Sequence, residues 1–184
     1  MAVGNAYSNQ IQNRNFLAPV GFKFVLNRSP KVAFFSNSST IPGVSLGVAN
    51  QATPLKDLPT PGDILEFNDF RLRFMVDENL ENYLEIQKWM RALGYPDSLA
   101  EIYNFQQDYD FKDSDLMNVY SDATLFVMNG SQSANFKVMF KDMFPYDLSD
   151  LQFDATDSDI DYLTAEVSFK YTIYNITDLS GKNL

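Results

Sequence analysis

Apolar and polar residues alternate along five stretches of the chain, and this alternation predicts half-buried β-strands. The stretches are residues 22–26, 70–76, 123–128, 136–141 and 163–173. Successive side chains of a strand point to opposite faces of the sheet, so a period of two places the apolar residues on one face. The last stretch is the longest, and we expect it to form the longest strand.

Residues 70–76 show the strictest alternation. The residues that we expect in the core are Phe70, Leu72, Phe74 and Val76. Arg71 and Arg73 alternate with them, so these arginines are expected on an exposed face or at a contact between subunits. This strand is therefore predicted to be buried on one face only.

The next segment carries the start, the period and the end of an α-helix. Asp77 is a suitable N-cap residue, because its carboxylate can accept hydrogen bonds from the N–H groups of the first turn. Apolar residues then recur at helical spacing over residues 83–93, and Gly94 supplies a C-terminal stop. Trp89, the only tryptophan, is expected to pack this helix against a sheet, with ligand stacking as the less favoured interpretation.

Proline and glycine predict where the strands end. Residues 60–63 (Thr-Pro-Gly-Asp) are expected to form a turn. The Asn-Gly pair at residues 129–130 predicts the turn of a β-hairpin, and Pro145 is expected to break the sheet. Residues 44–59 are weakly patterned and predict either a hairpin or an exposed loop.

These elements predict a mainly β fold of the α+β class, an antiparallel β-sandwich or barrel with one packed α-helix. The length of 184 residues fits a single domain. Residues 1–15 are polar and are interpreted as a flexible N-terminal arm, which leaves residues 16–184 for the domain. Residues 97–120 are aromatic and acidic without a clear period, so we expect a loop insertion there.

Composition excludes most kinds of active site. The chain has no Cys and no His, which removes thiolate nucleophiles, imidazole bases and the usual zinc ligands. Residues 157–161 have the first half of a calcium-loop spacing but lack its glycine and closing glutamate, so a weak calcium site is only a minor alternative. No apolar run approaches the about 20 residues that span a bilayer, and we expect no membrane partner. We predict a non-enzymatic protein without catalytic residues, cofactor or metal.

Charge is divided unevenly along the chain. Residues 1–56 hold five of the 14 basic residues and no acidic one, so the rest holds nine basic and all 24 acidic residues. A solvated acidic surface is the simpler interpretation, but complementary patches of this kind can also pair one copy with the next. The candidate subunit-interface residues are Lys23, Arg28, Lys31, Lys56, Arg71, Arg73, Asp157, Asp159 and Asp161.

Several short motifs follow one another in a defined order between residues 16 and 176. They are Thr40-Ile41-Pro42-Gly43, Thr60-Pro61-Gly62-Asp63, Phe67 to Phe74, Asp77-Glu78-Asn79, Ile86-Gln87-Lys88-Trp89, Phe140 to Pro145, Leu151-Gln152-Phe153-Asp154 and a last strand through Tyr171. Each motif alone has low specificity. In this order they resemble the tail tube protein family of contractile-tailed, T4-like bacteriophages.

The resemblance implies a ring-forming structural protein of the virion. Such proteins form hexameric rings that stack into a tube, around which a sheath contracts and through which the genome passes. We therefore expect stacked homo-hexamers, sheath and baseplate proteins as partners, genomic DNA in the lumen, and a place in the phage tail after assembly in the host cytoplasm. An acidic lumen would repel DNA phosphates and let the genome slide. A tube initiator or terminator of the same fold is the first alternative.

A binding module is the alternative from a different functional class. A β-sandwich that recognises carbohydrate or protein in a baseplate would need an exposed aromatic cleft, for which Tyr103, Phe105, Tyr109 and Phe111 are candidates. An enzyme has the least support, because no nucleophile is paired with a base in the sequence.

Overall fold

A computed structural model describes most of the chain. The described residues are 16–17, 19, 21–29, 32–33, 35–101, 120–153 and 162–183. The N-terminal arm at residues 1–15 and most of the expected insertion lie outside them. The same holds for the four candidate aromatic-cleft residues and for Lys31, Asp157, Asp159 and Asp161.

Nine strands and one long helix make up the described fold. Their bounds are β1 Phe22–Leu26, β2 Ser36–Ser39, β3 Val44–Gln51, β4 Leu58–Phe67, β5 Phe70–Met75, α2 Glu81–Gly94, β6 Ser121–Met128, β7 Ala134–Leu148, β8 Thr164–Lys170 and β9 Ile173–Thr177. The strand stretches predicted at residues 22–26, 70–76, 123–128 and 136–141 are therefore confirmed. The fold is mainly β with one packed helix, as the alternation indicated.

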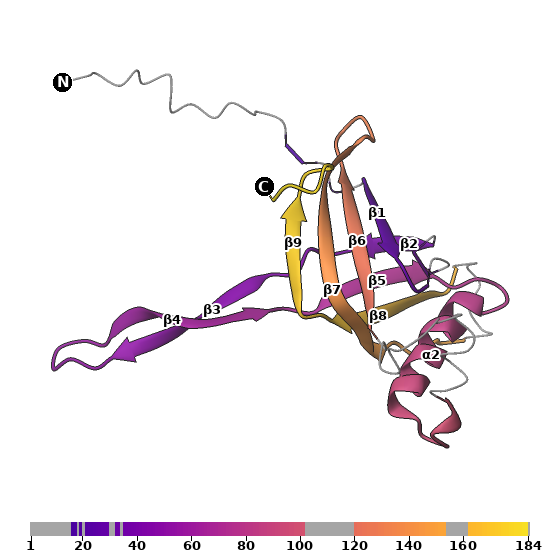
Figure 1. Cartoon of the computed structure of the whole chain (residues 1–184), viewed down its shortest axis with the longest axis horizontal. Helices are drawn as coiled ribbons and strands as arrows, with labels where there is room; N and C mark the ends of the chain where they lie inside the picture. The colour runs from indigo at the N-terminus through magenta and orange to yellow at the C-terminus, as the bar shows by residue number, and fades with distance from the viewer. Residues whose placement is uncertain are drawn as a thin grey trace.

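Seven strands form one sheet that folds back on itself through β7. The order is β1-β6-β7-β8-β5-β2, with β9 also paired to β7, and all pairs are antiparallel. Strand β7 pairs with β6 and β9 along its first part and with β8 along its last part. Figure 1 shows the upright strands β9, β7, β6 and β1 crossed by β5 and β8. This crossing encloses the core between the two halves.

Aromatic side chains fill the space between the two halves of the sheet. Phe70 stacks on Phe24 with ring centroids 5.1 Å apart and contacts Phe140 at 4.7 Å. Phe70, Leu72 and Phe74 are fully buried, and Arg71 and Arg73 point outward from the same strand. The predicted two faces of this strand are thus both confirmed.

The segment predicted as one long final strand is two strands, and it is not the longest. A break at residues 171–172 separates β8, which also pairs with β5, from β9. Lys170 is opposite Phe144 and Ile173 is opposite Lys141, so both segments follow β7 in one register. The apolar alternation in the sequence explains why a single strand was predicted, but the buried face changes at the break. Phe169 is fully buried, whereas Ile173, predicted on the same face, is 39% exposed.

The predicted break at Pro145 is wrong, because Pro145 lies inside β7 and is opposite Phe169. Strand β7 runs for 15 residues and is the longest strand. The register with β8 shifts between Pro145 and Asp147. A proline lacks the N–H of a regular ladder, and such a local irregularity is where a strand tolerates it.

The predicted turn at residues 60–63 is also wrong, because these residues lie inside β4. The turn is between residues 51 and 58, and β3 and β4 form a long antiparallel hairpin. Pro61 is opposite Val48, next to a shift in register. A two-stranded ribbon has an open edge along each strand, so proline causes little loss of pairing there.

Helix α2 begins later than expected. Leu80, in a left-handed conformation with φ of 59°, precedes its first residue, and its side chain makes no capping hydrogen bond. The Asp77 carboxylate instead accepts a hydrogen bond from the backbone N–H of Asn82 at 3.3 Å. Asp77 is therefore not the N-cap residue, although it does bind a backbone N–H of the first turn. Gly94 is the last residue of the helix, but it is not the C-cap residue as predicted, because Tyr95 takes the left-handed conformation with φ of 32° and donates its N–H to the Arg91 carbonyl oxygen.

Trp89 fixes α2 to the rest of the domain. Its side chain is fully buried, lies 6.3 Å from the ring of Phe169, and has the Arg28 guanidinium 5.2 Å from its ring centroid. The expectation that Trp89 packs the helix is confirmed. Among the described residues no helix is long and apolar enough to cross a membrane.

Candidate assembly surfaces

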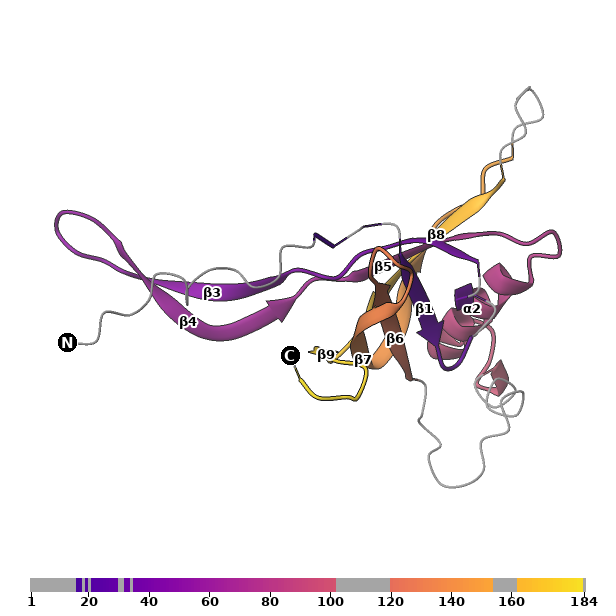
Figure 2. The same cartoon turned by 90° about the horizontal axis from the view of Figure 1, so that it is seen from above.

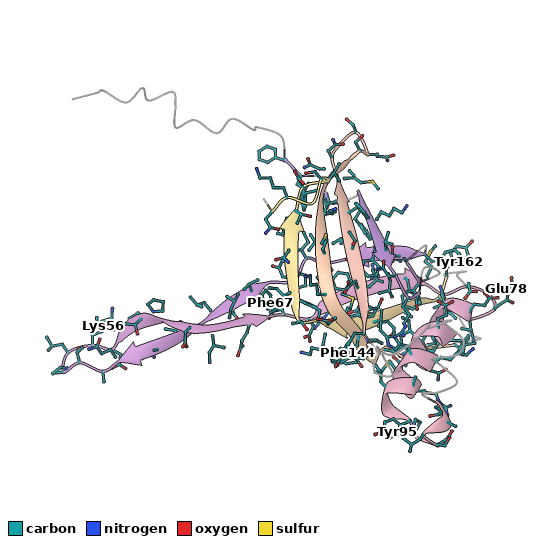
Figure 3. The ribbon with its side chains drawn as sticks, in the orientation of Figure 1. Lys56, Phe67, Glu78, Tyr95, Phe144 and Tyr162 are labelled. Atoms are coloured by element: carbon teal, nitrogen blue, oxygen red, sulfur yellow. The ribbon has the colours of Figure 1, made fainter. Side chains whose placement is uncertain are left out.

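The β3–β4 hairpin projects far from the body of the domain. Figures 1 and 2 show it leaving the sheet as a thin ribbon, and among the described strands β3 and β4 pair only with each other. Every residue of β3 is exposed, as are most residues of β4. Figure 3 labels Lys56 near the far end of the hairpin and Phe67 where it meets the body.

One face of this hairpin is apolar. Strand pairing places Val44 opposite Phe67, Leu46 opposite Leu65, and Val48 opposite Pro61. Residues directly opposite each other, and those two apart along a strand, share a face. Val48 is 65% exposed and Leu65 is 52% exposed. An exposed apolar stripe of this kind marks a surface that another protein covers.

One of the two glycines in the hairpin lets its two strands approach closely. A Cβ atom on Gly62 would lie 2.7 Å from the carbonyl oxygen of Gly47 and 2.9 Å from its carbonyl carbon. A Cβ atom on Gly47 would meet nothing closer than the Ile64 carbonyl oxygen at 3.4 Å. Only Gly62 is therefore required by the packing of the backbone.

An ion pair lies at the root of the hairpin. The Asp69 carboxylate is 2.5 Å from Lys170 Nζ and accepts a 2.5 Å hydrogen bond from the Tyr146 hydroxyl. A cavity of about 620 Å³ opens beside it, between residues 40–43 and 66–69, with Arg71 at its wall. The hydrogen bonds from Lys170 and Tyr146 hold the pKa of Asp69 below its usual value.

Acid is expected to remove the contribution of Asp69 to stability. The folded-state pKa of Asp69 is lowered, so its contacts stabilise the fold above the unfolded pKa of about 4 and are lost as pH falls through the folded value. We expect Asp69→Asn to lower the melting temperature at pH 7 and to have a smaller effect at pH 2.5. Melting curves followed by circular dichroism test this, and an equal loss at both pH values would contradict it.

The half-sheet β1-β6-β7-β9 has a free edge at each end. Among the strands described, β1 pairs only with β6 and β9 pairs only with β7. The last residue of β9, Thr177, also forms an isolated β-bridge with Asn183, so the free part of this edge is residues 173–176. Ile173 and Ile176 on β9 are 39% and 38% exposed. A cavity of about 530 Å³ lies beside β1, lined by residues 22–25, Ala33 and Ser36. Free edges expose backbone groups that can pair with another chain.

The outward face of this half-sheet carries lysines around an aromatic residue. Lys23 on β1 is opposite Phe126 on β6, and Phe126 is opposite Lys137 on β7. Lys141 is exposed further along β7. The Lys137 ammonium also donates a long hydrogen bond of 3.5 Å to the Leu179 carbonyl oxygen. This face is more basic than the chain as a whole.

The structure separates the residues predicted for a subunit interface. Lys23, Lys56, Arg71 and Arg73 are exposed, on β1, at the hairpin end and on β5 respectively. Arg28 is 8% exposed in the single chain and its guanidinium packs over Trp89, so it contributes to the interior of the domain. The remaining candidates, Lys31, Asp157, Asp159 and Asp161, lie outside the described residues.

The sequence interpretation missed the apolar hairpin face and the tyrosines at its root. The apolar residues Val44, Leu46 and Val48 do alternate, and this was the available signal. Prolines and glycines nearby made the pattern look weak. No group of three or more metal-binding side chains gathers in the part of the chain that the structure describes.

The comparisons with family models and with solved structures indicate one fold. A family model described as "Phage tail tube protein" matches residues 2–177. Similar solved structures include the sheath-tube complex of the PVC extracellular contractile injection system. The match has 14% sequence identity and a TM-score of 0.54, and it covers 90% of this chain and 94% of the other chain. The 6-fold symmetrised anti-feeding prophage baseplate has 11% identity, 92% and 97% coverage, and a TM-score of 0.51. The anti-feeding prophage tube-terminating cap has 14% identity, 97% and 99% coverage, and a TM-score of 0.54. The comparison with curated protein sequences gives no match.

Proposed function

Because the chain belongs to the phage tail tube protein family, we propose that it is the subunit of a hexameric ring that stacks into the inner tube of a contractile phage tail. A structural role in a tube follows from the family, whereas the number of subunits per ring, the stacking of rings and the passage of DNA are our proposal. The observation that carries it is a half-sheet with two free edges beside a protruding apolar hairpin.

Ring closure is proposed to join β9 of one subunit to β1 of the next. All neighbours in the half-sheet β1-β6-β7-β9 are antiparallel, so β1 and β9 run in opposite directions. Copies related by rotation about a common axis would then bring β9 next to an antiparallel β1. In such a contact one surface of a subunit binds a different surface of the next subunit. Repeating this contact forms a closed ring when the rotation per subunit is a whole fraction of a full turn. The sixfold symmetry of the structurally similar baseplate supports six subunits.

The hairpin is proposed to join one ring to the next. Its apolar face extends beyond the body, so a neighbouring copy could cover it without disturbing the β9–β1 contact. Lys56 is exposed near its far end, and it is proposed to contact this neighbour, as its place among the predicted subunit-interface residues suggests. Sheath and baseplate proteins are the expected partners of the stacked rings.

The channel is proposed to be lined by the outward face of the half-sheet. Lys23, Lys137 and Lys141 would then face the lumen, and the expected acidic lumen does not fit this face. Genomic DNA is the proposed content, in a virion assembled in the host cytoplasm. The role is structural and needs no cofactor or catalysis.

Mass photometry and negative-stain electron microscopy of the purified full-length chain test the proposal. A hexamer of the 21.0 kDa chain has a mass of six times that value, about 126 kDa. We expect rings with sixfold symmetry and hollow filaments of stacked rings. The hexamer would be ruled out if the chain remained a monomer at high concentration or formed rings with a different number of subunits.

A tube terminator is the second candidate, because the anti-feeding prophage cap matches over 97% of this chain. A terminator would form rings that do not stack with one another. Ring formation without filaments over a range of protein and salt concentrations would therefore favour the terminator over the tube subunit.

A further inference from the structure

The hairpin is held at its root by hydroxyl groups from the body. The Tyr171 hydroxyl donates to the Asn68 carbonyl oxygen at 2.7 Å, and the Tyr174 hydroxyl donates to the Pro42 carbonyl oxygen at 3.1 Å. Asn68 follows β4 and Pro42 precedes β3. The two tyrosines therefore hold both strands of the hairpin, one tyrosine for each strand.

Ring contacts strengthen the same attachment. Phe67, the last residue of β4, lies 5.4 Å from Tyr174 and 6.1 Å from Tyr171, measured between ring centroids. Tyr171 also packs against Phe140 in the core at 5.1 Å, and burial raises the pKa of its hydroxyl. Each tyrosine thus has its ring in the body and its hydroxyl on the hairpin.

A further set of contacts lies beside the tyrosines. Asp69, between β4 and β5, binds Lys170 of β8 and Tyr146 of β7. The backbone N–H of Asn68 donates to the Gly43 carbonyl oxygen at 3.0 Å and closes the hairpin at this level. Three strands of the body therefore contact a short segment of the hairpin. Beyond this segment, β3 and β4 pair only with each other among the described strands.

A small change of angle at this root has a large effect at the far end. The eight residues of β3 span about 25 Å at roughly 3.3 Å per residue, so a tilt of about 10° displaces the end by about 4 Å. That displacement is close to the spacing of neighbouring strands, about 4.8 Å. A hairpin that must fit a defined surface therefore needs a fixed direction.

We propose that Tyr171 and Tyr174 are positioning residues that fix the direction in which the hairpin leaves the body. Their hydroxyl groups bind the two carbonyl oxygens on either side of the root, and their rings keep both hydroxyls in place. The effect on stacking rests on the proposed function, whereas the effect on hairpin direction is a property of the single chain.

Distance measurement between two spin labels tests the proposal directly. The chain contains no native cysteine, so Ala52→Cys near the hairpin end and Lys88→Cys on exposed α2 give two unique label sites. Labelled chains are diluted with an excess of unlabelled full-length protein. Pulsed electron paramagnetic resonance then measures the distance between the two labels of one chain. We expect Tyr171→Phe with Tyr174→Phe to widen the distance distribution at least twofold.

Matched variants separate this effect from general damage. Tyr95→Phe also removes one hydroxyl, from a tyrosine at the end of α2 that is 48% exposed, and is expected to leave the width unchanged. Tyr174→Phe alone keeps both rings and one of the two hydroxyl contacts, so an intermediate width is expected. Circular dichroism verifies that each variant is folded.

An unchanged width in the double variant, or an equal widening in Tyr95→Phe, would overturn the positioning role. Ring and filament formation are measured on the same variants. A widened distribution supports the positioning role even if the unaltered chain forms no rings, in which case only the proposed function fails. Widening together with slower stacking supports both.

Discussion

Gly62→Ala is expected to slow ring stacking at least tenfold while the body of the protein stays folded. The added Cβ atom would lie 2.7 Å and 2.9 Å from backbone atoms of Gly47, a distance that only a shift of the backbone can relieve. The two strands must then separate, and the apolar face formed by residues such as Leu46 and Leu65 loses its shape. Because the hairpin lies outside the core, we expect the melting temperature to change by less than about 2 °C.

Gly47→Ala is the matched control for this substitution. It adds the same methyl group to the partner strand, where the closest contact is an ordinary 3.4 Å, and we expect less than a twofold change in stacking rate. Light scattering measures the growth of filaments, and sedimentation velocity measures the fraction of free rings. Equal stacking rates for the two variants would show that the shape of the hairpin does not control this step.

Ile173→Lys together with Ile176→Lys is expected to weaken ring closure about 100-fold. The two isoleucines are three apart on the edge strand β9, so they point to opposite faces, and both are more than one-third exposed. Apolar contacts buried in an interface contribute about 1–2 kcal/mol each, and about 1.4 kcal/mol corresponds to a tenfold change in affinity. Lysine also opposes pairing at a strand edge by keeping it hydrated.

Leu84→Lys provides the control for ring closure. Leu84 is 39% exposed, as Ile173 is, but it lies on α2 and away from the β9 edge. The control is expected to form rings with the affinity of the unaltered chain. Analytical ultracentrifugation over a range of concentrations gives the affinities, and a control that loses rings as strongly as the β9 variant would contradict a β9 interface.

Local patterns predicted the elements whose burial follows from their own sequence. Phe70, Leu72 and Phe74 alternate with arginines, and the strand, its core face and its outward face all followed from that pattern. The buried position of Trp89 followed from its place on an amphipathic helix. Each of these elements has one side in the core, and the hydrophobic effect alone selects that side.

The hairpin could not be predicted in the same way, because none of the described residues of the body buries its strands. Pro59, Pro61 and Gly62 are typical of turns, and they occur in β4 because a ribbon with two open edges tolerates missing N–H groups. The end of the helix at Gly94 was clear, but its start depends on Leu80 in a left-handed conformation, which no local rule indicates.

The distribution of charge along the chain did not predict which basic residues are buried. Arg28 belongs to the basic first part of the chain, yet its guanidinium lies over Trp89 in the interior. An uneven distribution of charge along a sequence does not predict which side chains lie on the same surface of the folded protein. The tyrosines at the hairpin root contact residues about 100 positions away, and such pairs depend on the tertiary fold.

The break between β8 and β9 has a consequence for the order of assembly. Tyr171 and Tyr174, which hold the hairpin, are interleaved with Ile173, whose side chain is exposed on the free edge. In the proposed tube, a neighbour that pairs with β9 would restrict the same few residues on which the hairpin depends. Ring closure would then restrict the hairpin in advance, so stacking would cause a smaller further loss of its conformational entropy. The two kinds of contact would be cooperative, and complete rings would stack more readily than single chains.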